Sequence, residues 1–374
     1  MKRIRFSVLI LCACFVSVAW GTPTACTADT PWVEFHRSNM QRWNWCENLL
    51  SVSTVGNLGL KWSFATSDYV FSSPAVVNAV VYVGSDDHNL YALNATTGAK
   101  LWSFTTGAVL GSSPAVANGV VYVDSYDNNV YALNATTGTT LWNSSGGGFS
   151  SPAVVNAVVY VGSDDRKMYA LNATTGAKMW NYTTAGTVLS SPAVANGVVY
   201  VGSYDNNVYA LNASTGAKLW KYTTGGYVVS SPAVANGVVY VGSYDKNVYA
   251  LNASTGAKLW SYATGDVVTS SPAVANGAVY FGSYDKKVYA LSAKTGVKLW
   301  SYTTGGLVYS SPAVANGVVY VGSYDKNVYA LNAKTGAKLW SYTTGGGVYT
   351  SPSVANGLVY VGSDDGNVYA FGLK

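Results

Sequence analysis

The chain repeats itself with a fixed period along most of its length. The segment Ala250-Leu-Asn-Ala-Ser-Thr-Gly-Ala-Lys-Leu-Trp260 recurs with small changes and always ends on tryptophan. The tryptophans are forty residues apart, except for one interval of thirty-eight: Trp62, Trp102, Trp142, Trp180, Trp220, Trp260, Trp300 and Trp340. A period of about forty residues predicts an array of equal units, none of which can bury its apolar face alone.

One unit predicts four short strands, at residues 231–235, 238–243, 248–252 and 258–262. Asn236-Gly237 joins the first two strands, and Asn-Gly between alternating apolar runs is a strong hairpin signal because both residues tolerate positive φ. Polar turns join the others. Four antiparallel strands repeated eight times predict an all-β fold, an eight-bladed β-propeller of four-stranded antiparallel blades.

The two ends of the repeat region predict a closed ring. The last unit stops at Lys374 without a fourth strand, and the strand around Trp62 has no blade of its own. Pairing the two completes eight blades, whereas an open solenoid would leave unpaired strand edges. We therefore expect a propeller over residues 58–374, preceded by an irregular arm over residues 22–57 that packs its aromatic side chains on the propeller.

The first 21 residues predict a secretory signal peptide. Lys2, Arg3 and Arg5 precede an uncharged, mostly apolar run over residues 6–19, and a small residue, Gly21, marks the expected cleavage point. An uncleaved anchor and a lipoprotein site around Cys14 are the alternatives. Export implies a periplasmic, cell-surface or secreted protein.

Cysteine and charge limit the class of protein further. Cys26 and Cys46 remain after signal removal, which allows one disulfide in an exported protein, although two free thiols are the alternative. The formal net charge is +5, and the signal peptide carries three of those charges. Without a basic stripe we expect no nucleic-acid partner. We also expect no membrane span after the signal, and a monomer.

The segment from Ala92 to Trp102, Ala-x-Asn-x-x-Thr-Gly-x-x-x-Trp, resembles the tryptophan-docking motif of the quinoprotein (PQQ-like) propeller repeats. That family usually has Asp where this chain has Asn94, Asn134, Asn172, Asn212, Asn252 and Asn332, with Ser292 at the remaining position. The resemblance implies that the repeated tryptophans pack between blades as structural residues. The family contains dehydrogenases that hold pyrroloquinoline quinone and calcium, and non-enzymatic scaffolds such as the outer-membrane assembly lipoprotein.

The residues that the dehydrogenases require are missing from the repeats. Calcium there needs oxygen ligands that include a glutamate, but Glu34 and Glu47 both precede the propeller. No adjacent cysteines remain after signal removal. His36 lies in the arm and His88 in a turn, so no nucleophile has a positioned base. We predict no catalytic, cofactor-binding or metal-binding residue, and expect pyrroloquinoline quinone and calcium only under the enzyme alternative.

Each unit also carries an aspartate in its second-to-third-strand turn. These are Asp87, Asp127, Asp165, Asp205, Asp245, Asp285, Asp325 and Asp365. A ring of cation sites is one interpretation, but aspartate in a tight turn favours local hydrogen bonds to the backbone. The Asn-Ala-Ser/Thr sequons, such as the one at Asn94, could accept glycans if the host glycosylates exported proteins.

The loop from tryptophan to proline varies between units more than the strands do. Three residues before each proline stand Phe71, Gly111, Phe149, Leu189, Val229, Thr269, Tyr309 and Tyr349. The preceding position is valine in six units, with Leu110 and Gly148 the exceptions. In an extended segment, alternation places the valines on the packed side and the variable residues toward the axis or the rim.

The variable loop shares its face with the second-to-third-strand turn, which is rich in tyrosine and basic residues. The candidate contact face comprises Tyr69, Phe71, Tyr227, Tyr309 and Tyr349 from the loops, with Tyr204, Tyr244, Tyr284, Tyr324, Lys246 and Lys286 from the turns. Such a composition suits protein contacts, although neutral drift between duplicated units would also vary the loops. We expect an exported, non-enzymatic propeller that binds envelope or extracellular proteins. A quinone-dependent dehydrogenase and a carbohydrate- or cell-surface-binding module are the alternatives.

Overall fold

The computed structural model describes residues 32, 33, 35 and 41–374. The predicted signal peptide, Cys26, Glu34 and His36 lie outside the described residues. Cys46 lies within them and is disulfide-bonded. None of the described helices is long and apolar enough to cross a membrane.

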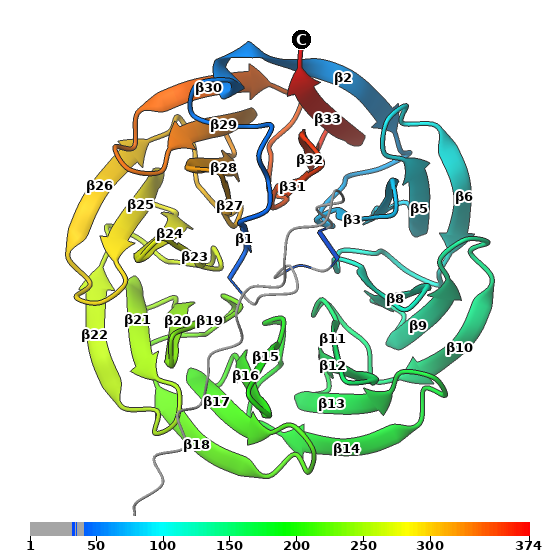
Figure 1. Cartoon of the computed structure of the whole chain (residues 1–374). Helices are drawn as coiled ribbons and strands as arrows, with labels where there is room; N and C mark the ends of the chain where they lie inside the picture. The colour runs from blue at the N-terminus through cyan, green and yellow to red at the C-terminus, as the bar shows by residue number, and fades with distance from the viewer. Residues whose placement is uncertain (1–31, 34, 36–40) are drawn as a thin grey trace, which may run out of the picture.

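The described chain forms eight blades of four antiparallel strands around a common axis, one of them extended by a parallel fifth strand from the arm, so the predicted propeller is confirmed (Figure 1). In the first seven blades the chain runs from the innermost strand to the outermost, and in the eighth the outermost strand is β2, from the start of the propeller. The first four blades are β3 (Ala75–Val77), β4 (Val80–Gly84), β5 (Asn89–Asn94) and β6 (Lys100–Thr105); β7 (Ala115–Ala117), β8 (Val120–Ser125), β9 (Asn129–Asn134) and β10 (Thr140–Ser145); β11 (Ala153–Val155), β12 (Val158–Gly162), β13 (Lys167–Asn172) and β14 (Lys178–Thr183); β15 (Ala193–Ala195), β16 (Val198–Gly202), β17 (Asn207–Asn212) and β18 (Lys218–Thr223). The last four are β19 (Ala233–Ala235), β20 (Val238–Gly242), β21 (Asn247–Asn252) and β22 (Lys258–Ala263); β23 (Ala273–Ala275), β24 (Ala278–Ser283), β25 (Lys287–Ser292) and β26 (Lys298–Thr303); β27 (Ala313–Ala315), β28 (Val318–Gly322), β29 (Asn327–Asn332) and β30 (Lys338–Thr343); β31 (Ser353–Ala355), β32 (Leu358–Gly362), β33 (Asn367–Leu373) and β2 (Leu58–Ala65).

The eighth blade closes the ring with strands from both ends of the propeller. β2 pairs antiparallel with β33, in a register that runs from Leu58 opposite Leu373 to Ala65 opposite Asn367. The sheet order β2-β33-β32-β31 makes β2 the outermost strand of that blade. The predicted closure is therefore confirmed. It removes the strand edge that an unfinished eighth blade would expose.

The repeated tryptophan sits on the outermost strand and fastens each blade to the next. Its indole Nε1 donates to a backbone carbonyl of the following blade, as from Trp220 to Ala253 at 2.9 Å. A shift in register between Ala210 and Leu211 precedes it, and an irregularity of this kind re-aims side chains. Trp220 is 8 % exposed, while its neighbour Leu219 is 52 % exposed. Gly256 of the next blade lies over the indole ring, where an added Cβ would come within 2.7 Å.

A second ring of contacts surrounds the axis. One serine per blade stands directly before the proline that recurs in every unit. Its backbone N–H donates to Oγ of the equivalent serine in the next blade, at 2.8 to 3.1 Å. The eight serines are Ser73, Ser113, Ser151, Ser191, Ser231, Ser271, Ser311 and Ser351. Because the last bond returns from Ser351 to Ser73, the circle is complete.

The described part of the N-terminal arm lies against the innermost strands. β1 (Trp43–Asn44) pairs in parallel with β27, and Trp32, fully buried, forms a bridge with Val76 of β3. Arg42 is fully buried and donates to the backbone carbonyls of Phe35, Ser311, Pro312 and Pro352. These contacts satisfy edges of inner strands that would otherwise be unpaired.

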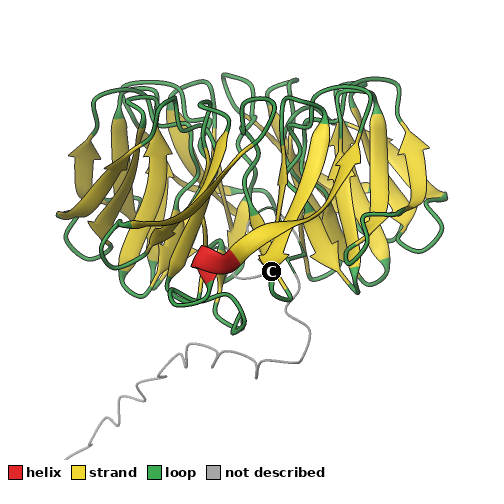
Figure 2. Cartoon of the chain, turned by 90° about the horizontal axis from the view of Figure 1, so that it is seen from above, coloured by secondary structure: helices red, strands yellow, loops and turns green. Residues whose placement is uncertain are grey.

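The last residues of the arm and the C-terminus lie on one side of the disc. Figure 2 shows the short 3-10 helix η1 (Val55–Asn57) and the C-terminus on the lower side. The loops between the fourth strand of one blade and the first of the next lie on the upper side, together with the second-to-third-strand turns. We call this upper side the mouth face. The Asn-Gly and Thr-Gly turns occupy the opposite face.

Candidate functional site

A cavity of about 480 Å³ follows the axis, and we call it the axial cavity. All eight variable positions before the prolines line it: Phe71, Gly111, Phe149, Leu189, Val229, Thr269, Tyr309 and Tyr349. The valines of the same loops are buried, as are Val70 and Val228. The eight serines of the axial ring line the cavity too, and Phe35 of the arm completes its wall. Residues that differ most between the repeats thus face one shared space.

The aromatic residues of the mouth face form three groups of touching rings. The first runs from Tyr69 through Phe71 and Tyr349 to Tyr309, Tyr284 and Tyr324, with neighbouring centroids 5.3 to 6.3 Å apart. The second joins Tyr204, Tyr227 and Tyr244 at 4.8 and 5.8 Å. The third is the pair of Tyr126 and Phe149 at 5.1 Å. Every aromatic residue of the candidate contact face belongs to one of the first two groups.

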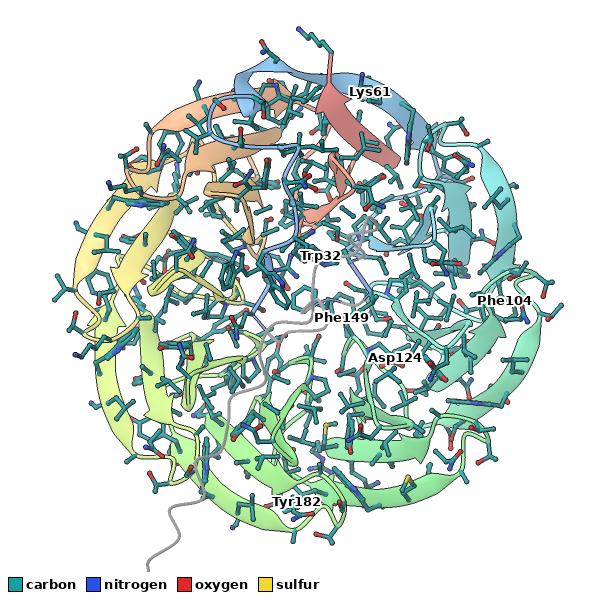
Figure 3. The ribbon with its side chains drawn as sticks, viewed as in Figure 1. Trp32, Lys61, Phe104, Asp124, Phe149 and Tyr182 are labelled. Atoms are coloured by element: carbon teal, nitrogen blue, oxygen red, sulfur yellow. The ribbon has the colours of Figure 1, made fainter. Side chains whose placement is uncertain are left out.

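Phe149 reaches toward the axis because its neighbouring blade has a glycine at the matching position. A Cβ added at Gly111 would come within 2.1 Å of the Phe149 ring. Figure 3 shows Phe149 close to the axis, whereas Phe104 and Tyr182 lie on outer strands. The loop variation therefore places an aromatic ring in the cavity wall, close to the axis.

The two lysines of the candidate contact face lie away from the ring contacts. Lys246 and Lys286 are exposed, and both have positive φ, at 71° and 68°. The Lys246 ammonium lies 3.6 Å from the carboxylate of Asp266 on the same face. Positive φ is uncommon in residues other than glycine, and here it is imposed by the tight turn. The turn therefore fixes the backbone position from which each lysine side chain extends.

The mouth face also carries carboxylates that the sequence analysis did not single out. At the turn position occupied by tyrosine in five blades, three blades have Asp86, Asp164 and Asp364. Asp86 lines the axial cavity. Burial, with smaller contributions from Asp68 and Asp87, raises the pKa of Asp86 to about 6. Burial likewise raises the pKa of Asp364 to about 6. The alternation of Ser-Tyr-Asp and Ser-Asp-Asp in this turn was the signal that could have revealed them.

The second blade departs from the repeat in another way. Asp124 replaces a glycine found in the other seven blades, and Gly148 replaces the packed valine. The Asp124 carboxylate is fully buried and accepts the Gly148 N–H at 2.7 Å, while its Oδ2 has no hydrogen-bond partner. Burial raises the pKa of Asp124 well above its usual range. The Asp124 carboxyl group thus occupies the space that the loop valine fills in other blades, where it packs on the equivalent glycine.

The repeated turn aspartates act as local hydrogen-bond acceptors. Asp245 accepts the N–H of Asn247, the Tyr249 hydroxyl at 2.6 Å and the Gly225 N–H of the preceding blade's loop. His88 is exposed in the equivalent turn of the first blade, with φ of 71°. In the sequons, Asn94 Oδ1 accepts the N–H groups of Thr96 and Thr97. These residues stabilise turns and connect blades.

The described residues offer poor chemistry for the quinone cofactor that the resemblance raised. No group of three His, Cys, Asp or Glu side chains that could hold a metal ion occurs within the described part of the chain. Glu47 accepts the N–H groups of Leu49, Leu50 and Gly357 and so caps backbone. Pyrroloquinoline quinone is a tricarboxylate, yet the charged side chain lining the axial cavity is a carboxylate, Asp86. The donor set does not fit that cofactor.

Comparison with protein families gives a match over nearly the whole propeller. The family model described as outer membrane protein assembly factor BamB matches residues 59–148, 143–230, 224–312 and 304–374. A comparison with curated protein sequences gives no match.

Solved structures share the fold at low sequence identity. The crystal structure of BamB from Moraxella catarrhalis is similar at 21 % identity with a TM-score of 0.74, covering 84 % of this chain and 99 % of that one. Quinohemoprotein alcohol dehydrogenase from Comamonas testosteroni is similar at 17 % identity with a TM-score of 0.81, covering 93 % and 81 %. The computationally designed Ika8 protein is similar at 18 % identity with a TM-score of 0.75, covering 82 % and 96 %. At these identities the likeness shows the fold alone.

Proposed function

Because the chain belongs to the family of the outer membrane protein assembly factor BamB, we propose that it is an exported, non-enzymatic binding propeller. It holds a protein partner of the cell envelope against its mouth face. The observation that carries this proposal is the gathering of aromatic side chains there, including exposed Tyr69, Tyr126, Tyr227 and Tyr324. Clustered tyrosines beside a concave centre are typical of residues that dominate protein interfaces.

The opposite face supports a different role. It carries repeated Asn-Gly and Thr-Gly turns, and the described part of the arm lies against the inner strands near it. Turn residues of this kind serve backbone geometry, since Asn236 and Gly237 both have positive φ. The mouth face is therefore the better candidate for partner contact.

The dehydrogenase alternative finds less support. Structures of quinohemoprotein dehydrogenases share the propeller, but one fold hosts many functions and the site decides between them. The cavity's carboxylate and hydroxyl groups do not suit a tricarboxylate cofactor. We derive no reaction step for this chain.

Site-specific photocrosslinking tests the proposal. p-Benzoylphenylalanine replaces Tyr324 on the mouth face, Lys334 on the opposite face or Leu259 on the outer rim, all of them exposed. Irradiation of cells that produce the protein should give a discrete protein adduct from position 324 alone. Equal adducts from all three positions, or none from position 324, would contradict the proposal. Binding of purified protein to a glycan array would instead favour the carbohydrate alternative.

A further inference from the structure

One sector of the axial cavity combines an aromatic wall with a carboxylate, and a second carboxylate lies in the neighbouring turn of the mouth face. The Phe71 and Tyr349 rings touch, with centroids 5.6 Å apart, and both line the cavity. Asp86 lines it in the same blade as Phe71. In the adjoining eighth blade, Asp364 holds the matching turn position, and its backbone N–H donates to the carbonyl of Gly347, two residues before Tyr349, at 2.9 Å. Acidic and aromatic side chains thus share the junction of the first and eighth blades.

Among the described residues, neither carboxylate forms an ion pair with a lysine or arginine, and the ionisable neighbour of opposite charge is His88, beside Asp86. The ion pairs found there join Lys167 to Asp165 and Lys246 to Asp266. Asp364 Oδ1 is buried and has no hydrogen-bond partner. A half-buried carboxylate without a partner is costly, and the cost would be offset by a cation supplied from outside.

The chain's own nearby cation is already committed. Arg42 donates to four backbone carbonyls and stacks on Phe35, with its guanidinium carbon 4.6 Å from the ring centroid. Phe35 itself lines the cavity. No lysine or arginine is among the described residues of the cavity wall. The cavity therefore has acidic, aromatic and hydroxyl groups facing its interior.

We propose that the axial cavity binds a lysine or arginine side chain presented by the partner protein. The cationic end lies between Asp86 of the cavity wall and Asp364 of the adjoining mouth-face turn, and the aliphatic stem lies against Phe71 and Tyr349. A cation close to an aromatic face gains attraction from the ring's quadrupole, and a desolvated carboxylate pair supplies charge complementarity that gives specificity. This inference rests on the proposed function, since it names the chemistry of the partner segment that the mouth face holds.

Peptide binding to the purified full chain tests the inference. The probe is Ac-Ala-Phe-Lys-Phe-Ala-NH2, compared with its norleucine analogue, which keeps the stem and lacks the charge. Titration calorimetry should show binding of the lysine peptide and at least tenfold weaker binding of the norleucine peptide. Saturation-transfer NMR should place the lysine methylenes against aromatic protons. Equal affinities for the two peptides, or no binding of either, would overturn the inference.

Variants separate the cavity from the rest of the acidic surface. D86N/D364N should weaken the lysine peptide at least tenfold. D266N, which removes a carboxylate elsewhere on the same face, should leave its affinity unchanged. Equal losses in the two variants would indicate only general charge attraction and would overturn the inference. Pentylamine should bind at least tenfold more weakly than the peptide, because equal binding would point to small amines as the ligand.

The photocrosslink distinguishes this inference from the proposed function. If D86N/D364N retains the adduct from position 324 in full, the partner binds without a cation in the cavity. The inference then fails while the proposed function stands. If the wild-type chain gives no adduct, the proposed function fails. The inference of a partner side chain fails with it, and peptide binding would then show only that the cavity accepts a cation. Loss of the adduct in D86N/D364N, but not in D266N, supports both.

Discussion

The backbone N–H of Ser351 donates a 3.0 Å hydrogen bond to Oγ of Ser73, 278 residues away in the sequence. The bond joins the first and eighth blades at the axis, while β2 joins β33 at the rim. Closure is therefore made twice, at the inner and the outer radius. The same blade junction carries Phe71, Asp86, Tyr349 and Asp364, the side chains to which we assign the binding of a partner's cation.

The outer joint predicts a large loss of stability when β2 is removed. Replacing residues 58–65 by a Gly-Ser linker of equal length keeps the arm attached but leaves β33 as an exposed edge. It also removes Leu58 and Trp62, which are 3 % and 7 % exposed. We expect Tm to fall by roughly 10 °C and soluble aggregates to appear. Calorimetry and gel filtration measure both, and an unchanged Tm would show that β2 does not close the ring.

Tryptophan docking predicts different costs for two adjacent residues. Trp220→Ala removes a buried ring and its 2.9 Å hydrogen bond to the Ala253 carbonyl, and should lower the free energy of unfolding by about 3–5 kcal/mol. Leu219→Ala, at an exposed position, should change it by less than about 0.5 kcal/mol. Urea unfolding of both variants makes the comparison. Similar values for the two would mean that the indole contributes no more than a surface side chain.

The repeat made most of this fold predictable. Period, turn residues and the unmatched ends at Trp62 and Lys374 together specified eight blades and their closure. Each depends on local chemistry: Asn-Gly needs positive φ, and an unpaired strand seeks a partner. The strands of the units are nearly identical, so each strand and turn predicted for one unit applied to the other units as well.

The site was predictable only in part. Alternation along an extended segment separates packed from facing residues, so the variable loop positions were expected to face the axis or the rim, and they line the axial cavity. The serine ring was not predicted because its bonds join residues forty positions apart. The acidic sector was also missed. Asp86 and Asp364 are far apart in sequence, and ring closure alone makes them neighbours. The pairing of the arm with the inner strands was not predicted either, because the arm lies outside the sequence repeat.

The pKa values of Asp86 and Asp364 are raised in the folded chain. Replacing both carboxylates by neutral side chains should therefore stabilise the protein at neutral pH but not at acidic pH. Each carboxyl has a folded-state pKa of about 6, above its ordinary value of 3.8, through burial first. Asp68, Asp87 and His88 lie near Asp86, and Asp365 and Asp86 near Asp364. The folded chain thus binds these protons more tightly than the unfolded chain. Stability from these groups is present below pH 4 and is lost as the pH rises through about 6.

D86N/D364N should therefore melt a few degrees above the wild type at pH 7.5 and show little difference near pH 4. Turn aspartates whose pKa is lowered, such as Asp205 and Asp365, act in the opposite direction. They are present in both proteins and cancel in the comparison. Thermal melts at the two pH values measure the difference. A variant less stable than the wild type at pH 7.5 would show that these carboxylates are paired in solution. If D86N/D364N has a higher Tm and also binds the lysine peptide more weakly, its loss of binding does not come from unfolding.

The position of Phe149 predicts strong coupling between two loops. Gly111→Ala would place a Cβ 2.1 Å from the Phe149 ring, so the ring must leave its contact with Tyr126. We expect a loss of about 1–3 kcal/mol from this overpacking. In the Phe149→Ala background the same change meets no ring, and should cost less than about 0.5 kcal/mol. A double-mutant cycle on the free energy of unfolding gives the coupling. Additive costs would mean that Phe149 does not lie over Gly111, and that the second and third blades leave this part of the cavity open.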